Sequence, residues 1–269
     1  MKQYNVKIYD DMVSPHNIKV DCDNVYDIDN VIGLPTFKYL NLSRLNSYNV
    51  FDLNNISYDN FLSQYKNFDN DKVTFLYIDD VLKYEQEYQT IVRFCIDYRI
   101  AVIVNAGSTL EEMGRCDKMY GLTPIGVLEE FGVLDLEPII LSGANLDKED
   151  YEKMSYYNAT LCLDITNDML KGNGIAQIVT AKKYNVNMIF NCKDIYKEMF
   201  LAYTLPRGIL NTTTAISPED VLEIACINMS KVFKKYKNNT YNIFNTGSLL
   251  DVVINGNNLK IIDTIFFSK

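Results

Sequence analysis

The sequence predicts an α/β protein built as an incomplete (β/α)8 TIM-like barrel, with a small β-sandwich formed by the N- and C-terminal segments. Three observations predict this fold. Apolar, strand-like runs alternate with amphipathic helical segments through the middle of the chain, short alternating runs mark both ends, and the early part of the middle is short of strands. Repeated strand-helix units indicate a parallel sheet that is buried on both faces.

Both ends of the chain have sequence patterns that are typical of short β-strands. Residues 4–31 contain short alternating runs that are broken by Asp-Asp, Ser-Pro and Asp-Asn pairs. Near the other end, Asn255 and Gly256 are predicted to form a hairpin turn between two apolar runs. We therefore expect residues 1–30 and 240–269 to form the small β-sandwich, and residues 31–239 to form the reduced barrel.

The middle of the chain alternates strands with helices. Asp147 and Ser217 are expected as helix N-caps, and Pro218 occupies the first turn of the last helix. Strands are expected at 31–40, 73–78, 101–106, 138–144, 159–165 and 186–191. Helices are expected near 58–68, 81–98, 109–116, 123–133, after 147, and near 174–184, 194–203 and 217–236.

Composition excludes several classes of function. The chain has 269 residues, 48% of them hydrophobic, and a net charge of −9 without a basic stripe, which argues against a nucleic-acid partner. It lacks an apolar run of about 18 residues and a signal-like N-terminus, so we expect a cytoplasmic protein without a membrane partner. Its six cysteines contain no C-x-x-C pair and are expected to be reduced and structural.

A single histidine limits the metal chemistry of the chain. Zinc and iron sites built from imidazoles need two or more histidines, and this chain has only His16. His16 follows a proline near the N-terminus, which favours a turn or surface position.

Four stretches in order carry a family resemblance. They are GRCDKMYGLTPIGVLEEFGVLDLEPIILSGANLDKEDYEKM (114–154), LDITNDMLKGNGIAQI (163–178), ISPEDVLEIACINMSKVF (216–233) and GSLLDVVI (247–254). Together they resemble the amidohydrolase superfamily, in its cytosine deaminase, guanine deaminase and chlorohydrolase-like branch. In the second stretch, Thr166 and Asn167 occupy the place of the family's Ser-Asn pair.

The resemblance also identifies the positions of the family's site. The first barrel strand of the family ends in two histidine metal ligands, where this chain has Asn41 and Ser43. A His-x-x-Glu motif then supplies a ligand and a proton-shuttling carboxylate, and here these places hold Asn105 and Ser108.

Two further family positions are also replaced. The histidine that ends the following strand corresponds to Ser142, and the metal-binding aspartate after the eighth strand corresponds to Cys192. The resemblance therefore implies that the zinc or iron site of the family is lost, that no cofactor is bound and that metal-dependent hydrolysis is absent. The vestigial site, a possible ligand pocket, comprises Asn41, Ser43, Asn105, Ser108, Ser142, Asn167 and Cys192.

Other chemistry at the same strand ends is less favoured. A serine or cysteine nucleophile would have no histidine base, and Lys193 has only its sequence proximity in its favour. Glu111 and Glu112 are interpreted as charges that complement a helix N-terminus. A rebuilt metal site is the remaining option, and its candidate ligands are Cys162, Asp164, Asp168, Cys192 and Asp194. Against this option, Cys162 is expected within a buried strand.

The early part of the barrel is too short for a complete fold. A (β/α)8 barrel takes about 250 residues by itself. Between Asn41 and Asn105 the sequence offers one good helix and one clear strand, where three strand-helix units are needed. We expect early units to be deleted or reduced to loops such as NVFDLNN (49–55), with the open strand edge covered by a partner subunit.

Three functional hypotheses remain open. The favoured one is a catalytically inactive amidohydrolase-like protein, a pseudoenzyme, that binds a small molecule or another subunit, either in a homo-oligomer or with an active paralogue. The alternative is a hydrolase or deaminase relative that acts on a small C–N bond substrate through a rebuilt or metal-independent site. The third is a chain that folds but has no selected activity.

The three hypotheses predict different contents of the barrel mouth. A binding protein should retain a pocket in which Asn41, Asn105, Ser142 and Asn191 form a hydrogen-bonded cluster in place of the ion. An enzyme should show a titratable group with a perturbed pKa there. A pure interaction protein should fill the mouth with large side chains such as Tyr39, Met188 or Phe190.

Overall fold

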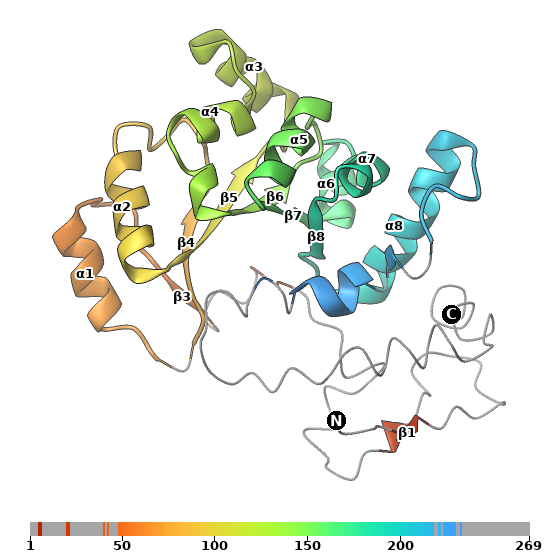
Figure 1. Ribbon diagram of the computed structural model, residues 1–269, viewed down its shortest axis with the longest axis horizontal. Coiled ribbons are helices and arrows are strands. Elements are labelled where there is room, and N and C mark those ends of the chain that lie inside the picture. Colours follow the sequence, from red (N-terminus) through yellow and green to blue (C-terminus); the bar gives the residue numbers. More distant parts are fainter. Residues whose placement is uncertain are drawn as a thin grey trace.

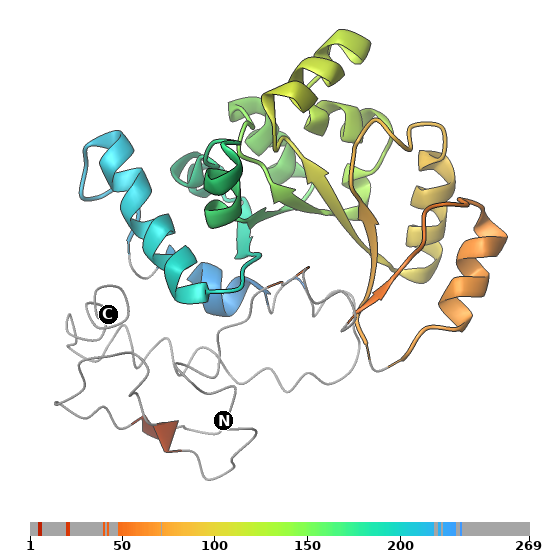
Figure 2. The same cartoon turned by 180° about the vertical axis from the view of Figure 1, so that it is seen from behind.

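The described part of the chain is a curved parallel sheet with helices on its outer side (Figures 1 and 2). In this computed structural model the sheet runs in chain order from β3 to β8, and all five pairings are parallel. The structure describes residues 5–6, 20–21, 40, 42, 48–70, 72–217, 220–221, 223–229 and 232, with backbone only at 5–6, 20–21, 196, 226 and 227. The strands are β3 (Asn49–Val50), β4 (Thr74–Ile78), β5 (Ala101–Ala106), β6 (Ile139–Ser142), β7 (Thr160–Leu163) and β8 (Asn187–Phe190).

Leu40 adds a further strand position beside β8. Its backbone N–H donates to the Phe190 carbonyl at 2.8 Å, and its own carbonyl accepts from the Cys192 N–H at 3.0 Å. The start of the barrel region therefore pairs in parallel with the end of its last strand, as the closing of a barrel requires. The predicted α/β barrel-like fold is confirmed, and the barrel is partial.

The helices form a layer on the outer side of the sheet (Figure 1). Asp147 caps α5 with a complete capping box, in which its side chain accepts the Asp150 N–H and Asp150 accepts the Asp147 N–H. Ser217 and Asp220 bond each other's backbone N–H groups in the same manner. The helices are α1 (Tyr58–Lys66), α2 (Tyr88–Tyr98), α3 (Leu110–Tyr120), α4 (Pro124–Glu130), α5 (Lys148–Tyr156), α6 (Ile165–Lys171), α7 (Ile178–Lys183), α8 (Ile195–Leu210), the short 3-10 helix η4 (Leu134–Leu136) and the π-helical turn η5 (Glu223–Asn228).

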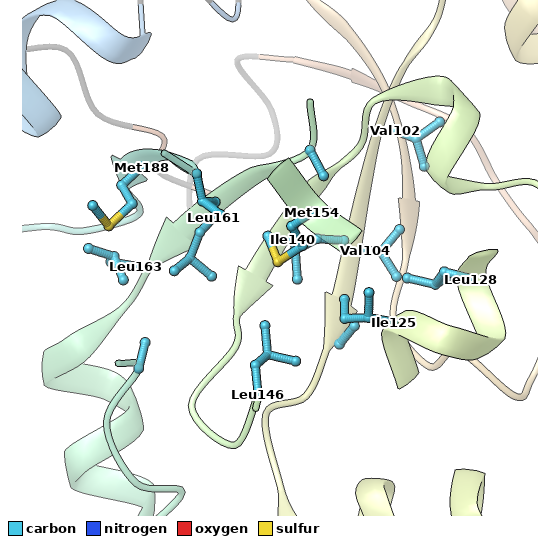
Figure 3. Packing of buried hydrophobic residues seen from close by; sticks show 14 of the residues in the cluster. Val102, Val104, Ile125, Leu128, Ile140, Leu146, Met154, Leu161, Leu163 and Met188 are labelled. Carbon is cyan, nitrogen blue, oxygen red and sulfur yellow. The ribbon is translucent and has the colours of Figure 1, made fainter. Parts of the chain in front are cut away.

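The larger core lies between the sheet and these helices. Alternate strand residues such as Val102, Val104 and Leu161 point outward and meet Leu128 of α4 and Met154 of α5 (Figure 3). All of these side chains are fully buried. This packing holds the strands in register, and so fixes where their carboxyl ends lie.

A smaller core lines the inner face of the sheet. It takes the other strand residues, including Ile103, Cys162 and Ile189, together with Met229 and Val232 from the last described segment. The expectation that Cys162 lies in a strand buried on both faces is confirmed, since its neighbours Leu161 and Leu163 belong to the larger core.

Three details of the predicted elements were wrong. The segment 49–55 is more than a loop, because Asn49 and Val50 form β3 and pair with Thr74 and Phe75 of β4. Helix α2 begins at Tyr88, after a run of turns that starts near residue 81. Helix α6 follows β7 directly and was not foreseen.

The terminal β-sandwich falls almost wholly outside the described residues and stays a prediction. The exceptions are β1 (Asn5–Val6) and β2 (Val20–Asp21), which pair antiparallel. Among the described helices, none is long and apolar enough to cross a membrane.

Candidate functional site

A cleft of about 650 Å³ opens at the carboxyl ends of β6, β7 and β8. The carboxyl ends of parallel strands are where loops converge and where ligands bind in barrels and in open α/β sheets. The cleft is lined by Leu42, Tyr77, Leu141, Asp164, Thr166, Asn167, Leu170, Lys171, Asn191, Cys192, Lys193, Asp194, Lys197 and Glu198.

A carboxylate and two carboxamides form the polar centre of the cleft. Asn191 Nδ2 donates to Asp164 Oδ2 at 2.9 Å, and Asn167 Nδ2 reaches the same oxygen at 3.3 Å. Asn191 Oδ1 accepts the backbone N–H of Leu42 at 3.1 Å. Burial raises the pKa of Asp164, and the two carboxamide hydrogen bonds oppose that rise. Asn191 thus joins β7, β8 and the chain after Leu40.

Ser142 and Asp168 form a second, buried pair behind the cleft. Ser142 Oγ lies 2.9 Å from each oxygen of the Asp168 carboxylate, which also accepts Asn173 Nδ2 at 3.0 Å. Ser142 has a φ of 73°, a left-handed conformation that is costly for a residue with a Cβ. Desolvation raises the pKa of Asp168. Both side chains are buried, so the pair is a structural contact between β6 and α6.

Asn105 and Ser108, which the resemblance assigns to the His-x-x-Glu positions, are held by local contacts. Asn105 Nδ2 donates to the Asp79 carbonyl at 3.3 Å. The backbone N–H and the hydroxyl of Ser108 both donate to Glu112 Oε2, at 3.0 and 3.3 Å. Glu112 is buried, and desolvation raises its pKa, so it is more than an exposed charge at the start of α3. Neither Asn105 nor Ser108 lines the cleft.

The two cysteines at the strand ends are buried thiols. Cys192 lines the cleft but is 7% exposed, and Cys162 is fully buried. Burial raises the pKa of both thiols well above the ordinary range, which disfavours the thiolate that a nucleophile or metal ligand requires.

Glu198 is a cleft residue that sequence reasoning missed. It is 1% exposed and its two carboxylate oxygens accept the backbone N–H groups of Ile165 and Thr166 at 3.0 Å each. Glu198 therefore anchors the start of α6 to α8, and this role depends on a contact between residues that are far apart in the sequence. The sequence carries no local signal for it.

The predicted site residues are only partly brought together. Asn167 and Cys192 line the cleft with Asn191, whereas Ser142 lies behind it and Asn105 and Ser108 lie apart. Asn41, Ser43 and Tyr39 lie outside the described residues. The expected cluster does not form among its described members, because Asn105, Ser142 and Asn191 each bond to a different partner. Met188 and Phe190 belong to the larger core and do not fill the cleft.

The donor set in the described residues does not fit a zinc site. Catalytic zinc is held by three protein ligands such as histidine, cysteine and carboxylate groups. Within the described ranges, no three such side chains come together. The candidates for a rebuilt site are separately engaged, since Asp164 accepts from Asn191, Asp168 accepts from Ser142, and Asp194 caps α8 through the Lys197 N–H.

Curated proteins match the middle of the chain in sequence. A 5-methylthioadenosine/S-adenosylhomocysteine deaminase of Pyrococcus abyssi is 29% identical over 143 residues, which cover 50% of this chain and 34% of the relative. The deaminase of the same name from Pyrococcus furiosus is 27% identical over 142 residues, 50% of this chain and 34% of the relative. The match thus spans about a third of the length of these relatives. No family model matches the sequence.

Solved structures match the fold. An adenosine deaminase from Xanthomonas campestris with bound zinc aligns with a TM-score of 0.57 at 14% identity, over 62% of this chain and 42% of that one. The atrazine chlorohydrolase TrzN from Arthrobacter aurescens, complexed with zinc, aligns with a TM-score of 0.59 at 16% identity, over 66% of this chain and 43% of that one. Both alignments show a shared fold. Taken with the sequence relatives, they support the resemblance of the middle of this chain to the amidohydrolase superfamily.

Proposed function

We propose that this chain is a non-catalytic amidohydrolase relative that uses the cleft at the ends of β6 to β8 to bind a small molecule. One observation carries the proposal. The cleft at the strand ends has a centre built from Asp164, Asn167 and Asn191, while the positions that the resemblance assigns to the family's metal ligands hold amide, hydroxyl and thiol groups. Such a pocket can recognise polar groups, and these positions offer no ligands for a metal that would activate water.

The electrostatics of the site support binding over catalysis. A general base must present its carboxylate to a substrate with a pKa near the working pH. The carboxyls with raised pKa values are mostly engaged: Asp168 is buried against Ser142, and Glu198 is held by two backbone N–H groups. Asp164 alone combines a raised pKa with a place at the centre of the cleft.

Asp164 therefore favours one alternative, an enzyme that acts on a C–N bond without the family's metal. In that case Asp164 would serve as the general base. Its replacement by Asn would then abolish turnover while leaving binding of a neutral substrate in place. The related deaminases act on nucleosides by name, so 5′-methylthioadenosine is the first substrate to assay.

The catalytic part of the proposal is tested by metal content and ammonia release. We expect protein purified without chelators to contain far less than one zinc or iron per chain, and to release no ammonia from 5′-methylthioadenosine or S-adenosylhomocysteine with added zinc. Zinc-dependent release would establish an active hydrolase and overturn the proposal. Release without metal that is lost in Asp164→Asn would establish the alternative.

The binding part is tested with two matched variants on α6. Asn167 lines the cleft, whereas its neighbour Met169 is 45% exposed and does not. We expect a metabolite panel to contain compounds that raise the melting temperature, with the rise lost in Asn167→Trp and kept in Met169→Trp. A rise that survives Asn167→Trp would place the ligand elsewhere.

A subunit partner is the second part of the proposal. In the described sheet the outermost strand is β3, which has only two residues, and strand edges invite pairing with another chain. We expect light scattering after size exclusion to give a mass of at least two chains. A monomer at high concentration would remove self-association from the proposal and leave an active paralogue as the candidate partner.

A further inference from the structure

The rim of the cleft carries three lysines, which share its lining with the three acidic residues Asp164, Asp194 and Glu198. Three lysines line it: Lys171 at the end of α6, Lys193 after β8 and Lys197 in the first turn of α8. We refer to these as the lysine rim. The whole chain carries a net charge of −9, so three lysines at one opening are a local departure from its average. All three side chains are exposed, and none forms a salt bridge with another described residue.

Two of the three acidic groups of the cleft are already engaged by backbone donors. Glu198 accepts the N–H groups of Ile165 and Thr166, and Asp194 accepts the Lys197 N–H as the N-cap of α8. These bonds hold both carboxylates in place while leaving them charged. Among the described residues, neither Glu198 nor Asp194 forms a salt bridge with the lysine rim.

Asp164 is the remaining carboxylate, and it lies at the centre of the cleft. Both carboxamide donors reach its Oδ2, and Asp164 makes no side-chain cap to α6. Neither carboxamide reaches its Oδ1, so the carboxylate has lone pairs for a donor that enters the cleft even though the Asn167 backbone N–H also stabilises it. Lys171 is close enough to favour the charged form of this carboxylate, so the acceptor and the lysine rim belong to one site.

We propose that the ligand of this cleft carries an anionic group, a carboxylate or a phosphate, that binds the lysine rim, and an N–H donor that binds Asp164. This inference rests on the proposed binding function of the cleft and adds the chemical class of the ligand. The anion and the donor are recognised by different elements, which favours molecules with separated charges over simple anions or amines.

A matched series of probes tests the two halves of the ligand separately. ε-Aminocaproate carries both groups, caproate only the anion and hexylamine only the donor, and all three share the same carbon chain. Phosphoethanolamine and inorganic phosphate repeat the comparison with phosphate in place of carboxylate. Ligand-observed NMR titrations of the full chain should show that probes with both groups bind about tenfold or more tightly than those with one.

Variants then assign each half to its residues. Replacing the whole lysine rim by glutamine should weaken the anionic probes about tenfold without weakening hexylamine. Asp164→Asn should weaken hexylamine and the two-group probes without weakening caproate and phosphate. The matched control is Lys66→Gln, Lys118→Gln and Lys183→Gln, which changes the net charge equally at exposed sites away from the cleft and should have no effect.

The outcomes separate this inference from the proposed function. Equal binding of anionic probes to the wild type and the rim variant would overturn the inference. Binding of neutral 5′-methylthioadenosine, blocked by Asn167→Trp, without binding of charged probes would also overturn it and would leave the proposed function intact. No binding by any probe, charged or neutral, would overturn both. Preference for phosphate over carboxylate probes, or the reverse, identifies the anion.

Discussion

At the residue scale, the Asn191 side chain links several segments of the site. It donates to Asp164 and accepts the Leu42 N–H, so it joins three chain segments at the mouth of the barrel. Asn191→Leu keeps the approximate volume but removes both bonds, which leaves a partly buried carboxylate and an N–H with fewer partners. We expect a loss of about 2 kcal/mol in the free energy of unfolding, measured by urea titration.

Asn54→Leu is the control for this change. Asn54 is exposed, and replacing it should change the free energy of unfolding by less than about 0.5 kcal/mol. If Asn191→Leu were as stable as Asn54→Leu, the carboxamide network would be incidental to the fold.

The Ser142–Asp168 pair makes a prediction about pH. Burial raises the native pKa of Asp168 despite its hydrogen bonds from Asn173 and Ser142. A carboxyl with a raised native pKa destabilises the protein above that pKa, and this cost disappears below its unfolded pKa of about 3.9. Wild type should therefore gain stability relative to Asp168→Asn as the pH falls from about 7 to about 4.

Urea titrations of both proteins across this pH range give the difference directly. Asn can accept from Asn173 and donate to Ser142, so the variant keeps the contacts while removing the titration. A relative loss of wild-type stability at low pH would mean that the pKa of Asp168 is lowered in the native protein.

At the element scale, the turn after β6 is set by the close approach of two strands. Gly143 has a φ of 62°, and a Cβ built there would lie 2.6 Å from Leu161 Cδ1 on β7. Gly172, which ends α6, has a φ of 72° but open space around the Cβ position. Gly172→Ala should cost only the backbone strain, about 1 kcal/mol.

Gly143→Ala adds a steric conflict to the same strain. Overpacking of a core contact costs about 1–3 kcal/mol, so this variant should be clearly less stable than Gly172→Ala in thermal unfolding. Equal melting temperatures would show that the Leu161 side chain moves aside without cost. Both variants introduce a Cβ at a positive φ, but only Gly143→Ala also introduces a steric conflict. The difference between their melting temperatures therefore measures the cost of that conflict.

Most elements of the barrel region could be predicted because their signals are local. The apolar run at 101–106 coincides with β5, and Asp147 and Ser217 act as the N-caps that their positions indicated. Strand β3 was not predicted, because two paired residues are too few to show an alternation of apolar and polar side chains. Helix α6 was not predicted, because its seven residues include Thr, Asn and Asp, which favour turns as often as helices.

The sequence predicted only part of the candidate site. Asn167 and Cys192, which line the cleft, were assigned to the site by the family resemblance. Asp164 was considered only as a metal ligand, and Glu198 was missed, since each role depends on a partner that is distant in sequence: Asn191 for Asp164, and Ile165 for Glu198.

At the scale of the whole molecule, burial is distributed unevenly across the partial barrel. Strands β5, β6 and β7 are buried on both faces, and Met229 and Val232 cover part of the inner side. β3 has two residues, and α1 buries only Phe61, which sits in an aromatic cluster with Phe51 and Phe94. The stability of the described part should therefore decline from β7 toward β3.

Hydrogen-exchange mass spectrometry can measure this gradient. Amides of β5, β6 and β7 should exchange only through global unfolding, whereas those of α1 and β3 should exchange through a smaller opening. Phe61→Ala leaves a cavity in the aromatic cluster and costs about 3–5 kcal/mol where the cluster is intact. It should accelerate exchange in α1, β3 and β4 while leaving β7 unchanged, and Tyr156→Ala, at a side chain that is 80% exposed, should change neither. Equal acceleration in β7 would mean that the partial barrel unfolds as one cooperative unit, with the two-residue strand β3 as firmly held as its centre.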